Sequence, residues 1–392
     1  MPPLYLDYNA THPPDMPSLQ KAIEIYSINY ANTSGISRLS QKAAYLLEEA
    51  RRNISTNLDI DSKQIIFTSS ASESNALFIQ SMLNYNRLQN KKKLQVYASP
   101  LDHPSVIDTL EAEPDIETKY LNVNKNGALD LENLEIILKN KQADFLCISH
   151  THNETGIFQP FDEIVKILRE YPVVTLVDAT QTLPKLNKLY LKKENIFLPS
   201  KDLPVFFSAS GHKIGAGFGT GILIRPDLPI GKNLEHYVFA KGGGQEFKIR
   251  SGTHNLPSIL AFDMVLTKRM NDDKLLEKLF ENTSFFEEEL SKELNVEIIG
   301  ANSHRMPGVS GIIFKDINVD FLLLGLDQKE ITVSTGSSCK SKAKKVSKGL
   351  VSMGISEKDA LNVLRFSYGK SFNDEQSSYT VNEICDIAKK IK

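Results

Sequence analysis

The sequence is poor in cysteine, with three in 392 residues, at positions 147, 339 and 385. Three thiols make neither a disulfide framework nor a four-cysteine zinc site, and such a composition is typical of a reducing compartment. No apolar stretch reaches the roughly 18 residues that a membrane span needs. The N-terminus also lacks the basic start and apolar centre of a signal peptide. These absences predict a cytoplasmic protein without a membrane partner.

Net charge is also small, because 46 Lys and Arg against 48 Asp and Glu leave −2 at pH 7. No excess of one sign is available to attract nucleic acid or an anionic membrane, so neither is expected as a partner. The chain is too long for one small core, which predicts two domains in contact.

From residue 64 onward, short apolar runs alternate with helical segments. Strands are expected at residues 65–67, 94–98, 145–148, 173–177 and 205–207, and helices near 73–88, 104–112, 131–140 and 161–170. This alternation is typical of α/β folds, in which helices cover both faces of a mainly parallel sheet. Longer helices follow residue 256. We therefore expect a large domain over residues 15–256 and a smaller α+β domain from residues 1–14 and 257–392.

A glycine-rich stretch, Ser-Ala-Ser-Gly-His-Lys-Ile-Gly-Ala-Gly-Phe-Gly-Thr-Gly at 208–221, lies between two apolar runs. Its small residues let the backbone approach a flat, charged ligand, and Lys213 within it can form a Schiff base with an aldehyde. Alternatively, the stretch is an ordinary glycine-rich hairpin with a solvated lysine. The neighbouring strand ends are needed to choose between these interpretations.

Polar residues follow the other predicted strands at the ends where ligands bind in open parallel sheets. Residues 68–73, rich in serine, open a helix as anion sites do, although a plain capping box has the same pattern. His103 follows the second strand and Asn153 the third. Asp178 ends the fourth, where a buried carboxylate needs a cationic or N–H partner unless it simply caps a helix. Histidines 150 and 152 come without the other ligands of a metal site, so no metal is expected.

Together, the strand ends offer a phosphate cradle, an imidazole, an amide, a carboxylate and an imine-forming lysine. This set fits pyridoxal 5'-phosphate (PLP), whose ring nitrogen must keep a proton if the ring is to accept electrons. A buried carboxylate holds that proton through a charge-assisted hydrogen bond. We therefore expect PLP as the cofactor.

Longer motifs make this interpretation specific. They are Tyr-Leu-Asp-Tyr-Asn-Ala-Thr (5–11), Phe-Thr-Ser-Ser-Ala-Ser-Glu-Ser-Asn (67–75), Asp-His-Pro-Ser-Val (102–106), Asn-Glu-Thr-Gly (153–156), Val-Asp-Ala-Thr-Gln (177–181), Ser-Gly-His-Lys (210–213), Gly-Gly-Gly-Gln-Glu (242–246), Arg-Ser-Gly-Thr-His-Asn (250–255), Ser-Thr-Gly-Ser-Ser-Cys (334–339) and Leu-Arg-Phe-Ser-Tyr-Gly (364–369). From Leu4 to about Gly369 the chain resembles the class-V aminotransferases of PLP-dependent fold type I, and among them the cysteine desulfurases of the NifS/IscS kind. The resemblance implies a large domain with a mainly parallel, seven-stranded sheet and a smaller α+β domain that carries a catalytic cysteine loop.

The resemblance also implies roles around the cofactor ring. Lys213 would bind PLP covalently and act in catalysis, and Asp178 would face the pyridine nitrogen. His103 would stack on the ring as a further catalytic residue. Asn153 and Gln181 would lie near the ring hydroxyl.

Phosphate and substrate contacts follow from the same resemblance. The phosphate would be held by Ala71, Ser72, Ser210 and His212. Thr253 would reach the phosphate of the neighbouring subunit, which implies a homodimer. Arg365, whose planar fork suits a carboxylate, would bind the substrate together with Asn153.

Cys339 stands in Ser-Thr-Gly-Ser-Ser-Cys-Lys-Ser-Lys, among small and basic residues without apolar periodicity. Such a cysteine is expected to be exposed and mobile, and Lys340 and Lys342 favour its thiolate. The resemblance makes Cys339 the nucleophile. Cys147 is expected in the core and Cys385 in the packing of a C-terminal helix.

The sequence departs from the family pattern at four places. Ser70 replaces the usual glycine of the phosphate turn, and His152 stands where an asparagine is common. Gly217-Phe218 replaces Pro-Lys, and Ser37 occupies a place often held by histidine. None of these changes removes a catalytic group, and together they indicate a divergent member.

We therefore expect a PLP-dependent cysteine desulfurase that converts L-cysteine to L-alanine and takes the sulfur as a cysteine persulfide. An iron–sulfur scaffold or a tRNA-thiolation protein would accept the sulfur. Alternatives within the class are a selenocysteine lyase, a cysteine sulfinate lyase and an aminotransferase. A weakly active scaffold for iron–sulfur assembly is a further alternative, although a binding-only protein has no need of a nucleophile.

Overall fold

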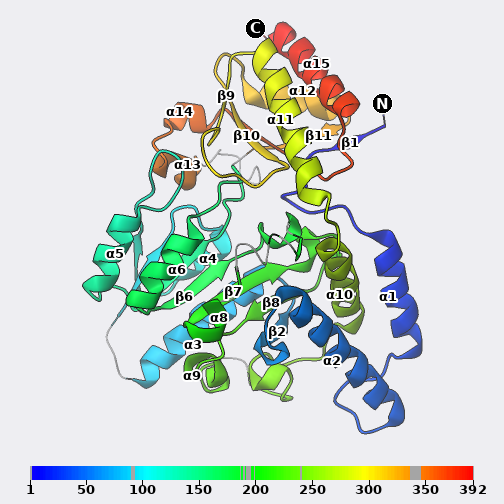
Figure 1. The fold of residues 1–392 in the computed structure, drawn as a ribbon, viewed down its shortest axis with the longest axis vertical. Coiled ribbons are helices and arrows are strands. Elements are labelled where there is room, and N and C mark those ends of the chain that lie inside the picture. Colours follow the sequence, from blue (N-terminus) through cyan, green and yellow to red (C-terminus); the bar gives the residue numbers. More distant parts are fainter. Residues whose placement is uncertain are drawn as a thin grey trace.

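The computed structural model describes residues 2–89, 93–185, 187–188, 190, 196–197, 199–238, 241–335 and 346–391. Within them the chain forms a larger body around a seven-stranded sheet and a smaller body around a four-stranded sheet (Figure 1). The chain begins at the smaller body, where β1 (Leu4–Tyr5) pairs in parallel with β11 (Ile331–Thr332). Across the described residues, no helix combines the length and apolarity needed to cross a bilayer.

The large sheet has the strand order β2-β8-β7-β6-β5-β3-β4. Its strands are β2 (Ile65–Thr68), β3 (Leu94–Ala98), β4 (Ile116–Tyr120), β5 (Phe145–Ser149), β6 (Val174–Asp178), β7 (Val205–Ser210) and β8 (Gly221–Ile224). The strands from β4 to β7 pair in parallel, whereas β8 is antiparallel to both β7 and β2. The predicted seven-stranded, mainly parallel sheet is confirmed. The pattern misses β4 because this edge strand is only partly buried and lacks an apolar run.

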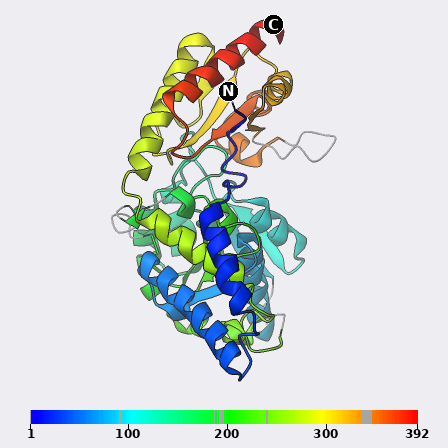
Figure 2. The same cartoon turned by 90° about the vertical axis from the view of Figure 1, so that its right-hand side faces the viewer.

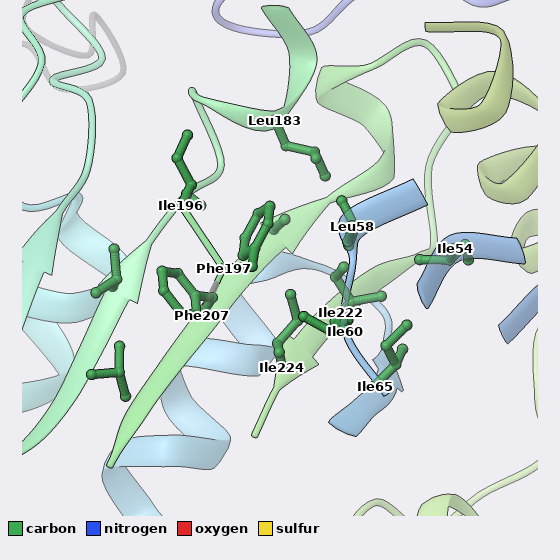
Figure 3. Packing of buried hydrophobic residues seen from close by; sticks show 14 of the residues in the cluster. Ile54, Leu58, Ile60, Ile65, Leu183, Ile196, Phe197, Phe207, Ile222 and Ile224 are labelled. Atoms are coloured by element: carbon green, nitrogen blue, oxygen red, sulfur yellow. The ribbon is translucent and has the colours of Figure 1, made fainter. Parts of the chain in front are cut away.

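Helices cover both faces of the large sheet, and β5 shows how one strand serves both. Phe145 and Cys147 join the cluster under α3 (Ala71–Leu88) and α4 (Pro104–Ala112), whereas Leu146 and Ile148 join the opposite cluster. The opposite face is covered by α2 (Arg38–Leu58), α5 (Leu131–Lys139), α6 (Phe161–Glu170) and α10 (Leu256–Met270). Figure 3 shows this second cluster, with α2 side chains against β7 and β8. Burial on both faces explains why these strands are continuous apolar runs.

The smaller body is an antiparallel sheet packed against helices. Its strands, in the order β12-β13-β10-β9, are β9 (Val296–Ile298), β10 (Val309–Phe314), β12 (Ser334–Thr335) and β13 (Val363–Ser367). The helices are α11 (Leu275–Glu293), α12 (Val319–Gln328) and α15 (Asp374–Ile391), with the short α13 (Lys348–Ser352) and α14 (Glu357–Ala360) at one edge. Phe286 lies at the centre of this core, with its ring 5.0 Å from that of Phe366. The predicted α+β architecture of the second domain is confirmed.

The helix α10 packs with the large sheet rather than with the small one. Leu260 and Leu266 share a buried cluster with Phe207 of β7, and α10 runs beside α1 (Met16–Ile28) and α2 (Figure 2). A domain boundary after Met270 therefore follows the packing, whereas the sequence pattern places it at residue 256. The helix α1 has no sequence signal because Ala22 is its one buried residue, which leaves no apolar stripe. The remaining short helices are α8 (Pro199–Asp202) and α9 (Pro229–Lys232).

Candidate active site

A cavity of about 290 Å³ opens at the carboxyl ends of the parallel strands. Its lining includes Ala71, Ser72, His103, Asn153, Asp178, Gln181, Ser210, His212 and Lys213 from the residues that the sequence singles out. Ala10, Ser70, Ser105, Ser149, Thr151 and Thr180 complete the lining. The convergence follows from topology, because the carboxyl ends of parallel strands meet at one edge of a sheet.

One end of the cavity is the N-terminus of α3. Ser70 caps this helix, its Oγ accepting a hydrogen bond from the backbone N–H of Glu73 at 3.2 Å. The Glu73 carboxylate in turn accepts one from the backbone N–H of Ser69 at 2.6 Å. The serine-rich turn is therefore both a capping arrangement and a polar wall of the cavity. Ser210 also lines the cavity, and its buried Oγ has no hydrogen-bond partner among the described residues.

Asp178 ends β6 with its carboxylate in the cavity wall and only 8% of the residue exposed. Its Oδ2 accepts a hydrogen bond from Nδ2 of Asn75 at 3.1 Å, and its Oδ1 accepts one from the backbone N–H of Thr180 at 2.9 Å. Both donors are neutral, so the negative charge of Asp178 is held by N–H groups and is directed at whatever fills the cavity.

Lys213 follows β7 in a single 3-10 turn, Gly211–Lys213. Its Nζ donates hydrogen bonds to the backbone carbonyl oxygens of Asn9, at 2.5 Å, and Ala10, at 2.9 Å. Burial and the nearby Arg365 guanidinium lower the pKa of Lys213 to about 8, against the opposing attraction of Asp178. The stretch is a β7–β8 hairpin, as one interpretation expects, but Lys213 is only partly exposed.

Two histidines flank this lysine. His103 caps α4, its Nδ1 accepting a hydrogen bond from the backbone N–H of Ser105 at 3.0 Å. Burial lowers the pKa of His103, and Lys213 acts in the same direction. His212 has its pKa lowered to about 4 for the same two reasons, and its ring stacks on Phe218 at 5.8 Å. Both imidazoles are therefore neutral near pH 7.

Two of the predicted residues, Arg365 and Thr253, do not line the cavity. Arg365 lies in β13, where its guanidinium donates to Oδ1 of Asp7 at 2.6 Å and to the carbonyl oxygen of Asn153 at 3.1 Å. Thr253 lies at a separate hollow of about 200 Å³, beside Thr68 and Ser69 of the turn that leads into α3. Cys339 lies outside the described residues. Arg365 thus contacts a residue of the cavity wall, Asn153, through a hydrogen bond. Thr253 is not part of the cavity wall of its own subunit.

The other two cysteines lie in cores, as expected. Cys147 is fully buried in β5, and burial raises its thiol pKa. Cys385 is 8% exposed and packs in the core of the smaller body. Neither is presented to the cavity.

The four departures from the family pattern have local explanations. Ser70 and Ser37 are helix N-caps, the latter accepting a hydrogen bond from the backbone N–H of Ser40 at 3.1 Å. His152 is buried against the hydroxyl of Thr155, and burial lowers its pKa to about 3. Gly217 has φ of +74°, which favours glycine, and Phe218 is 77% exposed.

Sequence reasoning misses two residues that orient this site. Asn75, one turn into α3, donates a hydrogen bond to the Asp178 carboxylate. Asn9, in the N-terminal arm that precedes α1, accepts a hydrogen bond from Nζ of Lys213. A buried polar residue on an otherwise apolar helix face is a signal for Asn75. Asn9 lies within the motif at 5–11, but no local pattern indicates its role, because its partners are distant in the chain.

Comparison with known proteins agrees with this architecture along the whole chain. Residues 4–375 match the family described as Aminotransferase class-V. A cysteine desulfurase IscS from Rickettsia massiliae (strain Mtu5) is 31% identical over 399 residues, which span 100% of this chain and 92% of that protein. A probable mitochondrial cysteine desulfurase from Dictyostelium discoideum is 32% identical over 408 residues, spanning 97% of this chain and 81% of that protein.

Solved structures share the fold. A NifS-like protein from Rickettsia africae ESF-5 superimposes with a TM-score of 0.83 at 27% identity and 99% coverage of both chains. SspA in complex with cysteine gives 0.77 at 26% identity, over 94% of this chain and 99% of that one. Fold and cavity thus define the class, an enzyme with the fold type I architecture of class-V aminotransferases. Within that class, the chain belongs to the NifS/IscS-like cysteine desulfurase family.

Proposed function

We propose that the protein is a PLP-dependent cysteine desulfurase that converts L-cysteine to L-alanine and takes the sulfur onto Cys339 as a persulfide. The observation that carries the proposal is the convergence of Lys213, Asp178 and the N-terminus of α3 on one cavity. Similarity to cysteine desulfurases over the full chain supports the reaction, and SspA in complex with cysteine supports the substrate.

The cavity residues fit PLP. When bound, PLP supplies a ring that accepts the electron pair released at the substrate α-carbon. Lys213 would hold the cofactor covalently, and Asp178 would keep a proton on its ring nitrogen. The first turn of α3 and the unpaired Oγ of Ser210 suit a phosphate, because helix N–H groups and a free hydroxyl are donors for an anion.

Lys213 is also suited to moving a proton. With a pKa of about 8, roughly a tenth of this amine is neutral at pH 7 and can accept a proton from the substrate α-carbon. An unperturbed lysine would be neutral far less often. The pKa of His103 is lowered, so this histidine, like His212, lines the cavity as a neutral imidazole and adds no positive charge.

Sulfur transfer is assigned to Cys339. Its thiolate attacks the sulfur of the substrate, so an S–S bond forms and the Cβ–S bond breaks. The electron pair of the broken bond stays on the substrate Cβ, which takes a proton. The α-carbon regains the proton that Lys213 removed, and the product leaves as alanine. Arg365 would bind the substrate carboxylate, because its guanidinium lies beside the cavity with Nε unpaired among the described residues.

The proposal includes a homodimer. Thr253 does not reach the cavity of its own subunit, and apolar side chains are exposed on α1 and the loop after it, namely Ile23 at 59%, Ile28 at 66% and Ile36 at 95%. A monomer in sedimentation would contradict this part.

The sulfur acceptor would be a protein such as an iron–sulfur scaffold or a tRNA-thiolation protein. A cytoplasmic location suits the free thiols of Cys147 and Cys385.

The test compares two cysteine substitutions. Cys339→Ala should reduce cysteine-dependent alanine and persulfide formation by about 10²-fold or more, because the nucleophile is removed. Cys385→Ala should leave both nearly unchanged, because Cys385 lies in the core of the smaller body. Undiminished persulfide transfer in Cys339→Ala would contradict the assignment. Assays with L-selenocysteine, cysteine sulfinate and a keto acid separate this reaction from the alternatives.

A further inference from the structure

A second lysine, Lys185, is buried next to the cavity. It ends a 3-10 turn, Leu183–Lys185, in the segment after β6, and only 6% of it is exposed. Its Nζ donates hydrogen bonds to Oδ1 of Asn9 and to the carbonyl oxygen of Gly308, both at 3.0 Å. Neither acceptor carries a charge. A neutral amine has two N–H donors, and these two acceptors satisfy both.

The surroundings of Lys185 do not favour a cation. A void of about 10 Å³, enough for one water, is lined by Lys185 together with other titratable groups. Those groups are Tyr8, His12, Lys213, Arg269 and Tyr368, and the charge of Arg365 also acts on it. Among the described residues, none of those that line this void carries a carboxylate. Burial and the neighbouring cations lower the pKa of Lys185 well below its ordinary value.

Asn9, which Lys185 contacts, connects several parts of the site. Its backbone carbonyl oxygen accepts hydrogen bonds from Nζ of Lys213 and from Nε2 of Gln181, the latter at 3.1 Å. Its Nδ2 donates to the carbonyl oxygen of Asn153 at 3.0 Å, and that same oxygen accepts from Arg365 at 3.1 Å. Asn9 therefore forms hydrogen bonds with Lys213 and with the Asn153 carbonyl oxygen that also accepts from Arg365.

The orientation of the Asn9 amide depends on Lys185. A donor at Oδ1 fixes which side of the amide faces Asn153, because the opposite side must then be the NH₂ group. Gly308 belongs to the smaller body, so the two hydrogen bonds of Lys185 also hold the arm between the two bodies. We propose that Lys185 is a neutral positioning residue, which clamps Asn9 and through it places the carbonyl that receives Nζ of Lys213. Its consequence for catalysis rests on the proposed role of Lys213.

The experiment measures the Lys213 amine in the protein freed of cofactor, by competitive acetylation across pH and mass spectrometry of the Lys213 peptide. Lys185→Met should lower the pKa of Lys213 by about half a unit to one unit, because its protonated amine loses a well-placed acceptor. If Lys185 were charged, the substitution would instead remove a repelling cation and raise that pKa. An unchanged or raised pKa would overturn the proposal. Lys188→Met, three residues along, is the matched control and should change nothing.

Two further variants keep the proposal testable if Lys185→Met does not fold. Lys185→Gln offers two neutral N–H donors and should keep the Lys213 pKa closer to the native value than Lys185→Arg does. Lys185→Arg places a permanent cation beside Lys213 and should lower that pKa. An arginine variant that matches the native protein while the glutamine variant does not would show that Lys185 is charged, and the proposal would fall. Because neither cofactor nor L-cysteine is present, this result is independent of the desulfurase proposal.

Discussion

The two sheets contribute to the site in different ways. The large sheet supplies groups at strand ends, with Asp178 closing β6 and Ser210 closing β7. The small sheet supplies Arg365 from the middle of β13, and this side chain is held by Asp7 and by the carbonyl oxygen of Asn153. Strand-end groups converge through sheet topology alone, whereas Arg365 is placed by contacts between segments far apart in the chain. The first kind of group should therefore govern chemistry, and the second kind should govern substrate binding.

The largest effect is expected at Asp178, the carboxylate at the end of a strand of the large sheet. Asp178 accepts hydrogen bonds from neutral N–H groups and faces the cavity, so Asp178→Asn should reduce kcat by about 10²- to 10³-fold. Asp102 is the control, since burial raises its pKa to about 7 and it is satisfied by Ser149 at 2.8 Å. At pH 7, Asp102→Asn replaces an acid that is about half neutral and should cost less than about threefold. Steady-state alanine formation measures both, and equal losses would contradict the distinction.

The strand-end residues can be predicted from sequence because their signal is local. Asp178 directly follows a buried apolar run, His103 and Asn153 each lie five positions after one, and a glycine-rich turn contains Lys213. Parallel β-α alternation then predicts that they meet at one edge. The α/β fold and the cavity follow from these patterns.

The remaining contacts have no local signal. Asn9 pairs with Ser367, 358 positions away, and receives Lys213 from 204 positions away. Arg365 has a signal only through its motif, and nothing near it in sequence indicates that Asp7 is its partner. Such pairings depend on how the arm threads between the two bodies. Lys185 illustrates the same point, because a lysine in a polar segment is usually exposed.

An intermediate effect tests the small-sheet side of the comparison. Arg365→Lys should raise KM for L-cysteine by about tenfold to a hundredfold with a smaller change in kcat, because an ammonium cannot bind Asp7, Asn153 and a carboxylate with one planar fork. Arg305→Lys is the control, since Arg305 makes a similar two-oxygen pair with Glu287 away from the cavity. Arg305→Lys should leave KM unchanged. A fall in kcat alone for Arg365→Lys would assign that residue to chemistry instead.

The smallest effect on activity is expected where the two bodies meet, because the group there acts on stability. Glu154 belongs to the loop after β5 and is 9% exposed, and its Oε2 has no hydrogen-bond partner among the described residues. Burial raises its pKa from 4.5 to about 7, although a hydrogen bond with Ser347, beside α13 of the smaller body, opposes the shift. The folded state therefore holds this proton more tightly than the unfolded chain does. Stability from this group is complete below pH 4.5 and is lost as pH rises to about 7.

Glu154→Gln should remove this dependence. The wild type should lose up to roughly 3 kcal/mol between pH 4.5 and pH 7, which corresponds to about 4 °C in Tm for a chain of this length. The Tm of Glu154→Gln relative to the wild type should therefore rise between pH 5 and pH 8 in calorimetry. Glu163→Gln, an exposed position on α6, should show no such change. A Tm difference that stays constant or shrinks with pH would mean that the Glu154 carboxylate is already charged at the junction, where the positive charge of Arg365 acts on it.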